Sequence, residues 1–150
     1  MSVTIIQDRL KNYALTTKQE ELNALKEIYQ EIALAALSRS DFFKHAAFQG
    51  GTALRIIHGL KRFSEDLDFV LLKPTQSFRW IRYLKAIELE FNSFGVNLEV
   101  KEREQAKGVI KTAFLKEDSF ARILELRYDR LPSDKQHITI KLEIDTHPPE

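Results

Sequence analysis

Two aspartates lie two residues apart in the otherwise mostly apolar segment "SEDLDFVLL" (64–72). Successive residues of a strand point to opposite faces, so a strand here would project Asp66 and Asp68 together and turn Leu67 and Phe69 into the core. Two carboxylates held this close repel each other. A divalent cation removes that repulsion, and Mg²⁺ favours carboxylate and phosphate oxygens. The pair therefore predicts a metal site.

A second feature lies upstream, where Gly50-Gly51-Thr52 leads into the amphipathic run "TALRIIHGL" (52–60). Glycines let the backbone approach a ligand closely, and the N-terminus of a helix presents N–H groups and positive dipole character to an anion. A Gly-Gly alone is usually only a turn, and an Asp-x-Asp alone is usually a solvated strand edge. Together they predict a site for a nucleoside triphosphate and its metal.

Hydrophobic periodicity predicts the elements that would position these residues. We expect helices at 18–38, 52–60 and 75–95, with a helical turn near 40–45 and Gly95 ending the longest of the later helices. We expect strands at 46–49, 65–72, 96–104, 108–115, 121–129 and 137–145. Helices mixed with several strands predict an α+β domain with a mixed sheet flanked by helices.

Composition sets further bounds. The chain has 150 residues, the size of one domain, and 23 basic against 22 acidic residues, so attraction to a polyanion would require local clustering. It lacks cysteine, which excludes thiolate chemistry. No signal peptide or membrane-spanning run is evident, so we expect a cytoplasmic protein without membrane contact. Because the chain stops just after a strong strand, we expect 1–150 to be a single domain that is either the N-terminal part of a longer protein or an unusually short version of one.

The stretch "GGTALRIIHGLKRFSEDLDF" (50–69) resembles the nucleotidyltransferase motif of the AbiEii/AbiGii toxin-type family, within the DNA polymerase β-like superfamily. The matching residues are Gly50, Gly51, Thr52, Leu54, Arg55, Arg62, Ser64, Asp66 and Asp68. Thr52 replaces a serine of the wider superfamily and keeps its hydroxyl. A later strand, "IKLEI" (140–144), resembles the hydrophobic-Lys-hydrophobic-Glu-hydrophobic strand of the same family.

The resemblance implies the nucleotidyltransferase fold and transfer of a nucleotide from an NTP to a hydroxyl, with two Mg²⁺ ions, or Mn²⁺ in their place. It assigns catalysis and metal binding to Asp66, Asp68 and a third carboxylate, for which we favour Glu143 and keep Asp145 in reserve. Lys141 shares the predicted face of Glu143 and would neutralise it. The residues expected to bind the nucleotide are Gly50, Gly51, Thr52, Arg62 and Ser64. For Arg62, a surface salt bridge with Glu65 is an equally good interpretation.

Two functions follow as alternatives. In the first, the protein is the toxin of a toxin–antitoxin or abortive-infection system that modifies RNA (tRNA) or a protein and is opposed by a cognate antitoxin. In the second, it is a catalytically incomplete module that binds nucleotide or a partner protein without transfer. Longer family members carry a C-terminal lysine and carboxylate that have no counterpart up to Glu150, which favours the second; the intact aspartate pair favours the first. A structural Ca²⁺ site at "EDLD" lacks EF-hand spacing, and the basic run 101–111 is either an RNA contact or a solvated loop.

Overall fold

The computed structural model describes residues 3–14, 17–49, 66–75, 77–103, 109–117 and 138–147. Its elements in chain order are α1 (Thr4–Leu10), α2 (Lys18–Arg39), α3 (Phe42–His45), β1 (Ala46–Gln49), β2 (Asp66–Leu71), α5 (Ile81–Ser93), β3 (Glu99–Glu102), β4 (Ile110–Glu117) and β5 (Ile138–Asp145). The predicted α+β class is confirmed. The predicted helix 52–60 and the predicted strand 121–129 lie outside the described residues.

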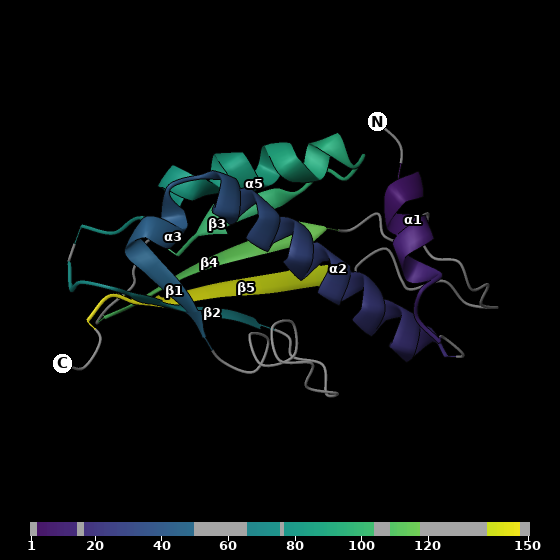
Figure 1. Ribbon diagram of the computed structural model, residues 1–150, viewed down its shortest axis with the longest axis horizontal. Coiled ribbons are helices and arrows are strands. Elements are labelled where there is room, and N and C mark those ends of the chain that lie inside the picture. Colours follow the sequence, from purple (N-terminus) through teal and green to yellow (C-terminus); the bar gives the residue numbers. More distant parts are fainter. Residues whose placement is uncertain are drawn as a thin grey trace.

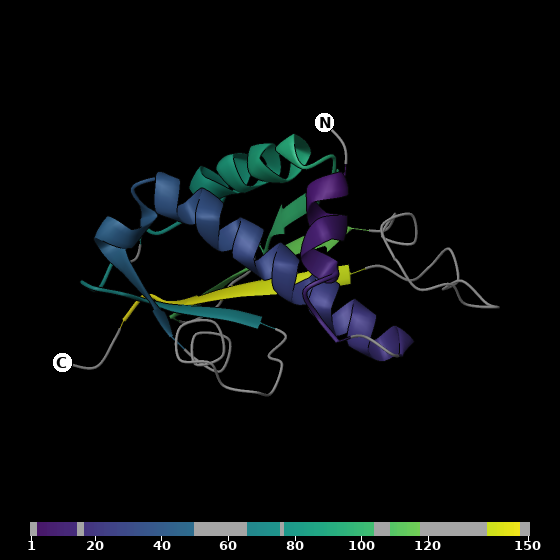
Figure 2. The same cartoon turned by 45° about the vertical axis from the view of Figure 1, so that its right-hand side comes forward.

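The strands form one five-stranded mixed sheet in the order β1-β2-β5-β4-β3. β2 and β5 are parallel, whereas the other neighbouring pairs are antiparallel. α2 and α5 lie against one face of this sheet, and α1 packs beside α2 (Figures 1 and 2). Among the described residues, no helix covers the opposite face, which we call the open face.

The covered face carries the core. Strands β2 and β5 alternate strictly between buried and half-buried residues, and Leu67 and Leu142 are fully buried beneath the helices. Apolar burial of this kind stabilises by about 25 cal/mol per Å², so it fixes which face of each strand turns inward. No helix within the described ranges is both long enough and apolar enough to cross a bilayer.

Helix α2 begins where the sequence supplies a cap. Thr17 Oγ1 accepts a hydrogen bond from the backbone N–H of Glu20 at 3.1 Å and donates one to the Glu20 carboxylate at 3.0 Å. A Thr-x-x-Glu pattern at a helix start is typical of a capping box. The predicted helix 18–38 therefore forms almost as expected.

Helix α5 is shorter than the predicted 75–95, because it begins at Ile81. The preceding residues bond elsewhere: Thr75 N–H donates to the carbonyl of Thr146 at 3.1 Å, and Ser77 N–H donates to Thr75 Oγ1 at 3.2 Å. The Trp80 N–H donates to the Glu102 carboxylate of β3 at 2.7 Å. At the other end, the predicted stop is confirmed, since Gly95 adopts a positive φ of 81°.

Helix α1 was not predicted, because its residues read as a polar start. Isolated helices this short are marginal in water. Here Ile6 and Leu10, each 1% exposed, pack into the core with α2. Their burial supplies the stability that the helix propensity of such a short segment does not.

An aromatic cluster joins α3, β2 and the start of α5. Phe42 is 1% exposed; its ring stacks on Trp80 at 5.5 Å and meets Phe69 edge-on at 5.0 Å. Phe43, the next residue, is 36% exposed.

We expect Phe42→Ala to lower the free energy of unfolding by about 3–5 kcal/mol, because it leaves a cavity in the aromatic cluster. Urea denaturation measures this loss. Phe43→Ala is the matched control and should cost less than half as much. Equal losses in the two variants would contradict this packing.

Candidate active site

The prediction for the aspartate pair is confirmed in its geometry. Asp66 and Asp68 are half-buried on the open face of β2, whereas Leu67 and Phe69 are 0% and 1% exposed on the covered face. The two carboxylates therefore share one side of the sheet, away from the hydrophobic core.

Parallel pairing with β5 brings a third carboxylate beside them. Asp68 is the register partner of Glu143, and Asp66 is the register partner of Lys141. Residues opposite each other on adjacent strands share a face. Segments that are distant in the sequence thus place Asp66, Asp68 and Glu143 on the same, open face of the sheet.

The row that contains Asp68 continues across the whole sheet. On β1 its register partner is Gln49. Beyond Glu143 lies Thr112 of β4, whose carbonyl accepts a hydrogen bond from the N–H of Arg103 at 2.9 Å, just past the end of β3. This row of the open face therefore runs from the carboxylates of Asp68 and Glu143 to an arginine at the end of β3.

Arg103 lies near the site although the sequence did not assign it there. Its guanidinium lies over the ring of Phe114, 5.5 Å from the centroid, and its charge opposes, in small part, the rise in the pKa of Lys141 that Glu143 causes. The prediction placed Arg103 only in the basic run 101–111. Strand alternation along 96–104 could have indicated its face, but not that β3 lies two strands away from β5.

Burial is the main cause of a raised pKa at Asp68, and the nearby charges of Glu143 and Asp66 raise it further. The ammonium of Lys141 acts in the opposite direction. Asp68 therefore carries its charge at a cost in the folded protein, since burial and neighbouring carboxylates both disfavour the ionised form.

Lys141 partly relieves this repulsion. Its Nζ lies 2.5 Å from Oε1 of Glu143, and this hydrogen bond, together with the charge of Glu143 and then that of Asp66, raises the pKa of Lys141. The prediction that Lys141 neutralises Glu143 is confirmed. As a result, Glu143 is engaged by a protein cation.

Asp145, the reserve candidate, has a different environment. Its register partners are Val70 on β2 and Ile110 on β4, and its Oδ1 accepts a hydrogen bond from the His147 N–H at 2.9 Å. It therefore lies one pair further along the sheet and supports a local turn, so Glu143 is the better-placed third carboxylate.

The remaining predicted site residues, Gly50, Gly51, Thr52, Arg62 and Ser64, lie outside the described residues. Asp66 and Asp68 with Glu143 form a donor set of carboxylate oxygens, which suits Mg²⁺ or Mn²⁺ chemically. Within the described ranges, however, no three carboxylate or histidine side chains converge closely enough to enclose a metal ion. Since Lys141 holds Glu143, the set fits a divalent cation only after that ion pair opens.

The mixed sheet with its flanking helices has the same fold as two crystal structures from Helicobacter pylori. One, provisionally assigned as a nucleotidyltransferase, matches with a TM-score of 0.52 and 21% identity over 87% of this chain and 47% of that one. The other, JHP933, matches with a TM-score of 0.51 and 18% identity over 91% of this chain and 48% of that one. The chain thus spans about half the length of these two proteins. No protein of curated function matches it.

The family follows from the sequence itself. Residues 32–150 match the family model described as "Nucleotidyl transferase AbiEii toxin, Type IV TA system". The chain belongs to this AbiEii family of nucleotidyltransferase toxins.

The raised pKa of Asp68 predicts a pH-dependent gain in stability for Asp68→Asn. As the pH rises through 3.8, the ordinary pKa of an aspartate, Asp68 loses its proton in the unfolded chain before it does so in the folded protein. Its contribution to the free energy of unfolding therefore falls as the pH rises. Asn removes that loss. We expect the variant, with chelator present, to melt on the order of a few degrees higher at neutral pH.

This gain should fade below pH 3.8, where Asp68 is protonated in both states. Melting curves followed by circular dichroism across this pH range test it. Asp8→Asn, at an exposed position of α1, is the control and should change little at any pH. A variant that melts lower than the wild type at neutral pH would contradict the charge cost at Asp68.

Proposed function

We propose that this protein transfers a nucleotide from an NTP to an RNA (tRNA) or protein acceptor, as the toxin of a type IV toxin–antitoxin pair with a cognate antitoxin. The observation that carries the proposal is the parallel pairing that sets Glu143 opposite Asp68, with Asp66 on the same face. Membership of the AbiEii family supports it. The acceptor hydroxyl would attack the α-phosphorus while pyrophosphate leaves.

The chain's own residues divide this work. Asp66, Asp68 and Glu143 would hold two divalent cations, Mg²⁺ or Mn²⁺, which when bound neutralise charge on the attacking and leaving oxygens. Gly51 and Thr52, which follow β1 in the chain, would contact the triphosphate through backbone N–H groups and a hydroxyl. Arg103, just past the end of β3, is positioned to offset phosphate charge.

A nucleotide-binding module without transfer is the second candidate. The ion pair between Lys141 and Glu143 favours it, because a carboxylate that stays engaged by an ammonium is not available to a metal. The two candidates agree on nucleotide binding and differ in the labelling of an acceptor.

Binding is tested by melting the protein with Mg²⁺ and each NTP in turn. A ligand at about 100 times its Kd adds about 2.7 kcal/mol of stability, or roughly 5–10 °C in Tm for a chain of this size. Asp66→Ala should abolish the shift. If no nucleotide shifts the wild-type Tm, both candidates fail.

Transfer is tested by incubation with labelled NTPs and total tRNA or cell protein. We expect Asp68→Asn and Glu143→Gln to reduce labelling by about 10²-fold or more, the scale of losing a group that stabilises charge in the transition state. Asp145→Asn is the matched control on the same face and should retain labelling. The opposite pattern, loss with Asp145→Asn alone, would assign the third carboxylate to Asp145.

Lys141→Met should tighten Mg²⁺ binding, because the variant lacks the cation that competes for Glu143. A partly exposed ion pair is worth about 0.2–1 kcal/mol, so we expect the Kd for Mg²⁺ to fall by up to about fivefold, measured calorimetrically without nucleotide. Lys116→Met, which changes a lysine of β4 on the same face, is the control. Weaker Mg²⁺ binding in Lys141→Met would show that Lys141 assists the site instead.

A further inference from the structure

A groove of about 620 Å³ lies at the end of β2 that is remote from Asp66. It is formed by the end of α3, the segment after β2 and the first turn of α5, on the side of the molecule where α3 lies in Figure 1. Its lining residues are Lys44, His45, Leu71, Leu72, Lys73, Pro74, Thr75, Ser77, Phe78, Arg79, Arg82 and Tyr83. None of them belongs to the proposed carboxylate site.

The charge of this groove is one-sided. Four of its described lining residues are lysine or arginine and none of them is acidic, although the chain as a whole has 23 lysines and arginines against 22 acidic residues. Such a local concentration of cations in a near-neutral protein attracts a polyanion.

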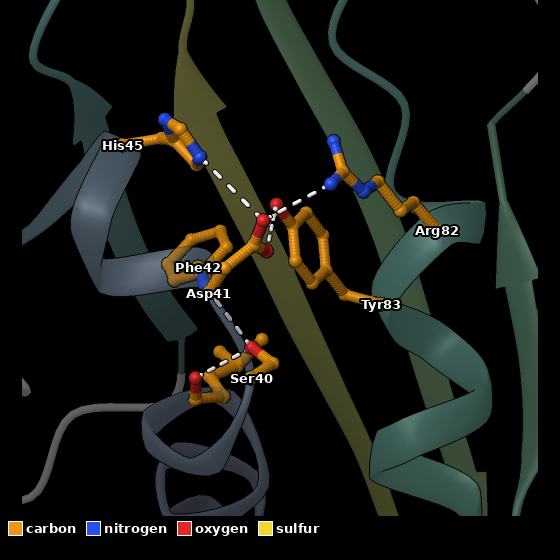
Figure 3. Close-up of polar contacts among 7 residues, drawn as sticks. Ser40, Asp41, Phe42, His45, Arg82 and Tyr83 are labelled. Atoms are coloured by element: carbon orange, nitrogen blue, oxygen red, sulfur yellow. Dashed lines mark hydrogen bonds and ion pairs between the residues drawn. The ribbon is translucent and has the colours of Figure 1, made fainter.

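Two arginines of the groove, Arg79 and Arg82, are held by carboxylates that do not line it. Asp41 accepts hydrogen bonds from Arg82 at 3.0 Å and from the Tyr83 hydroxyl at 2.9 Å, and its other near neighbour is His45 Nε2 at 3.6 Å (Figure 3). Arg79 is fixed separately, through Nε and Nη2 hydrogen bonds to the Glu102 carboxylate. The guanidinium groups are thus oriented before any ligand arrives.

Two lysines of the groove have no carboxylate partner among the described residues. Across the described segments, no carboxylate pairs with Lys44 or Lys73, and both side chains belong to exposed residues. Lysine is a strongly hydrated point charge that suits phosphate contacts, so these two are the strongest candidates to meet an anionic backbone.

The groove also offers apolar surface. Leu72 is 58% exposed, and the half-buried ring of Phe78 stacks on Tyr83 with centroids 6.1 Å apart. A positively charged groove with aromatic and apolar groups is typical of surfaces that bind single-stranded nucleic acid, in which cations follow the backbone and bases contact rings. Inorganic phosphate alone would not need this surface.

Strands β1 and β2 connect the groove to the carboxylates. Leu71 lines the groove, and Asp68 lies three residues earlier on the same strand, about 10 Å away at roughly 3.3 Å per residue. Between them, the open face carries the uncharged pair Ala47 and Val70. Leu71 is turned toward the covered face and Asp68 toward the open face, so a bound strand would reach Asp68 by crossing the margin of the sheet at the end of β2.

We propose that this groove binds single-stranded nucleic acid through Lys44, Lys73, Arg79 and Arg82. The binding of nucleic acid to the groove does not depend on the function proposed above. The further statement that the bound strand is the acceptor, with its end near Asp68, rests on that function.

The test is fluorescence anisotropy with a short labelled single-stranded RNA. The double variant Lys44→Glu/Lys73→Glu should weaken binding by at least about tenfold and make it less salt-dependent, because each lost phosphate contact reduces the magnitude of the negative slope of log K against log salt by about 0.7. Lys11→Glu/Lys85→Glu makes the same charge change away from the groove and should bind nearly like the wild type. Circular dichroism checks that both variants fold.

Several outcomes would overturn the proposal. These are no RNA binding by the wild type at low salt, equal losses in the two double variants, and competition by polyglutamate as strong as competition by unlabelled RNA, which would indicate an acidic protein partner instead. The two proposals fail separately. Asp68→Asn should still bind RNA, and Lys44→Glu/Lys73→Glu should keep its melting shift with NTP and Mg²⁺.

Discussion

The parallel register between β2 and β5 is the constraint on which the candidate site depends. Leu67 and Leu142 are buried opposite each other under the helices, so the next residues along, Asp68 and Glu143, must face the open side together. A slip of one residue would bring a carboxylate into the core and expose a leucine. Hydrophobic burial thus holds together side chains that repel each other, and Lys141 relieves part of that repulsion.

The two faces of the sheet have different tasks. The covered face, with α2, α5 and the aromatic cluster around Phe42, supplies stability. The open face carries the charged rows. Glu102 joins the two, because its carboxylate caps α5 at Trp80 and holds Arg79, while Arg103, the next residue, lies near Lys141. The basic groove and the acidic row are therefore built on the same few strands.

Local pattern was sufficient for much of this arrangement. Alternation along 65–72 and 137–145 predicted the outward faces of Asp66, Asp68 and Glu143, because each strand buries only one of its faces. The order of the strands in the sheet could not be predicted from local pattern, because nothing in the residues near Arg103 indicates that two strands separate β3 from β2. The start of α5 was also missed, since it is set by Glu102, a distant residue, and α1 forms only because Ile6 and Leu10 find a core.

Both outermost strands of the sheet, β1 and β3, have only four residues, and three of the four residues of β3, "EVKE", are charged. Short, charged margins offer little unpaired backbone for another chain to extend the sheet. The described edge strands therefore disfavour aggregation by edge-to-edge pairing of sheets from different molecules. Another macromolecule would accordingly have to recognise side chains on its faces, where the sequence can be tuned without rebuilding the fold.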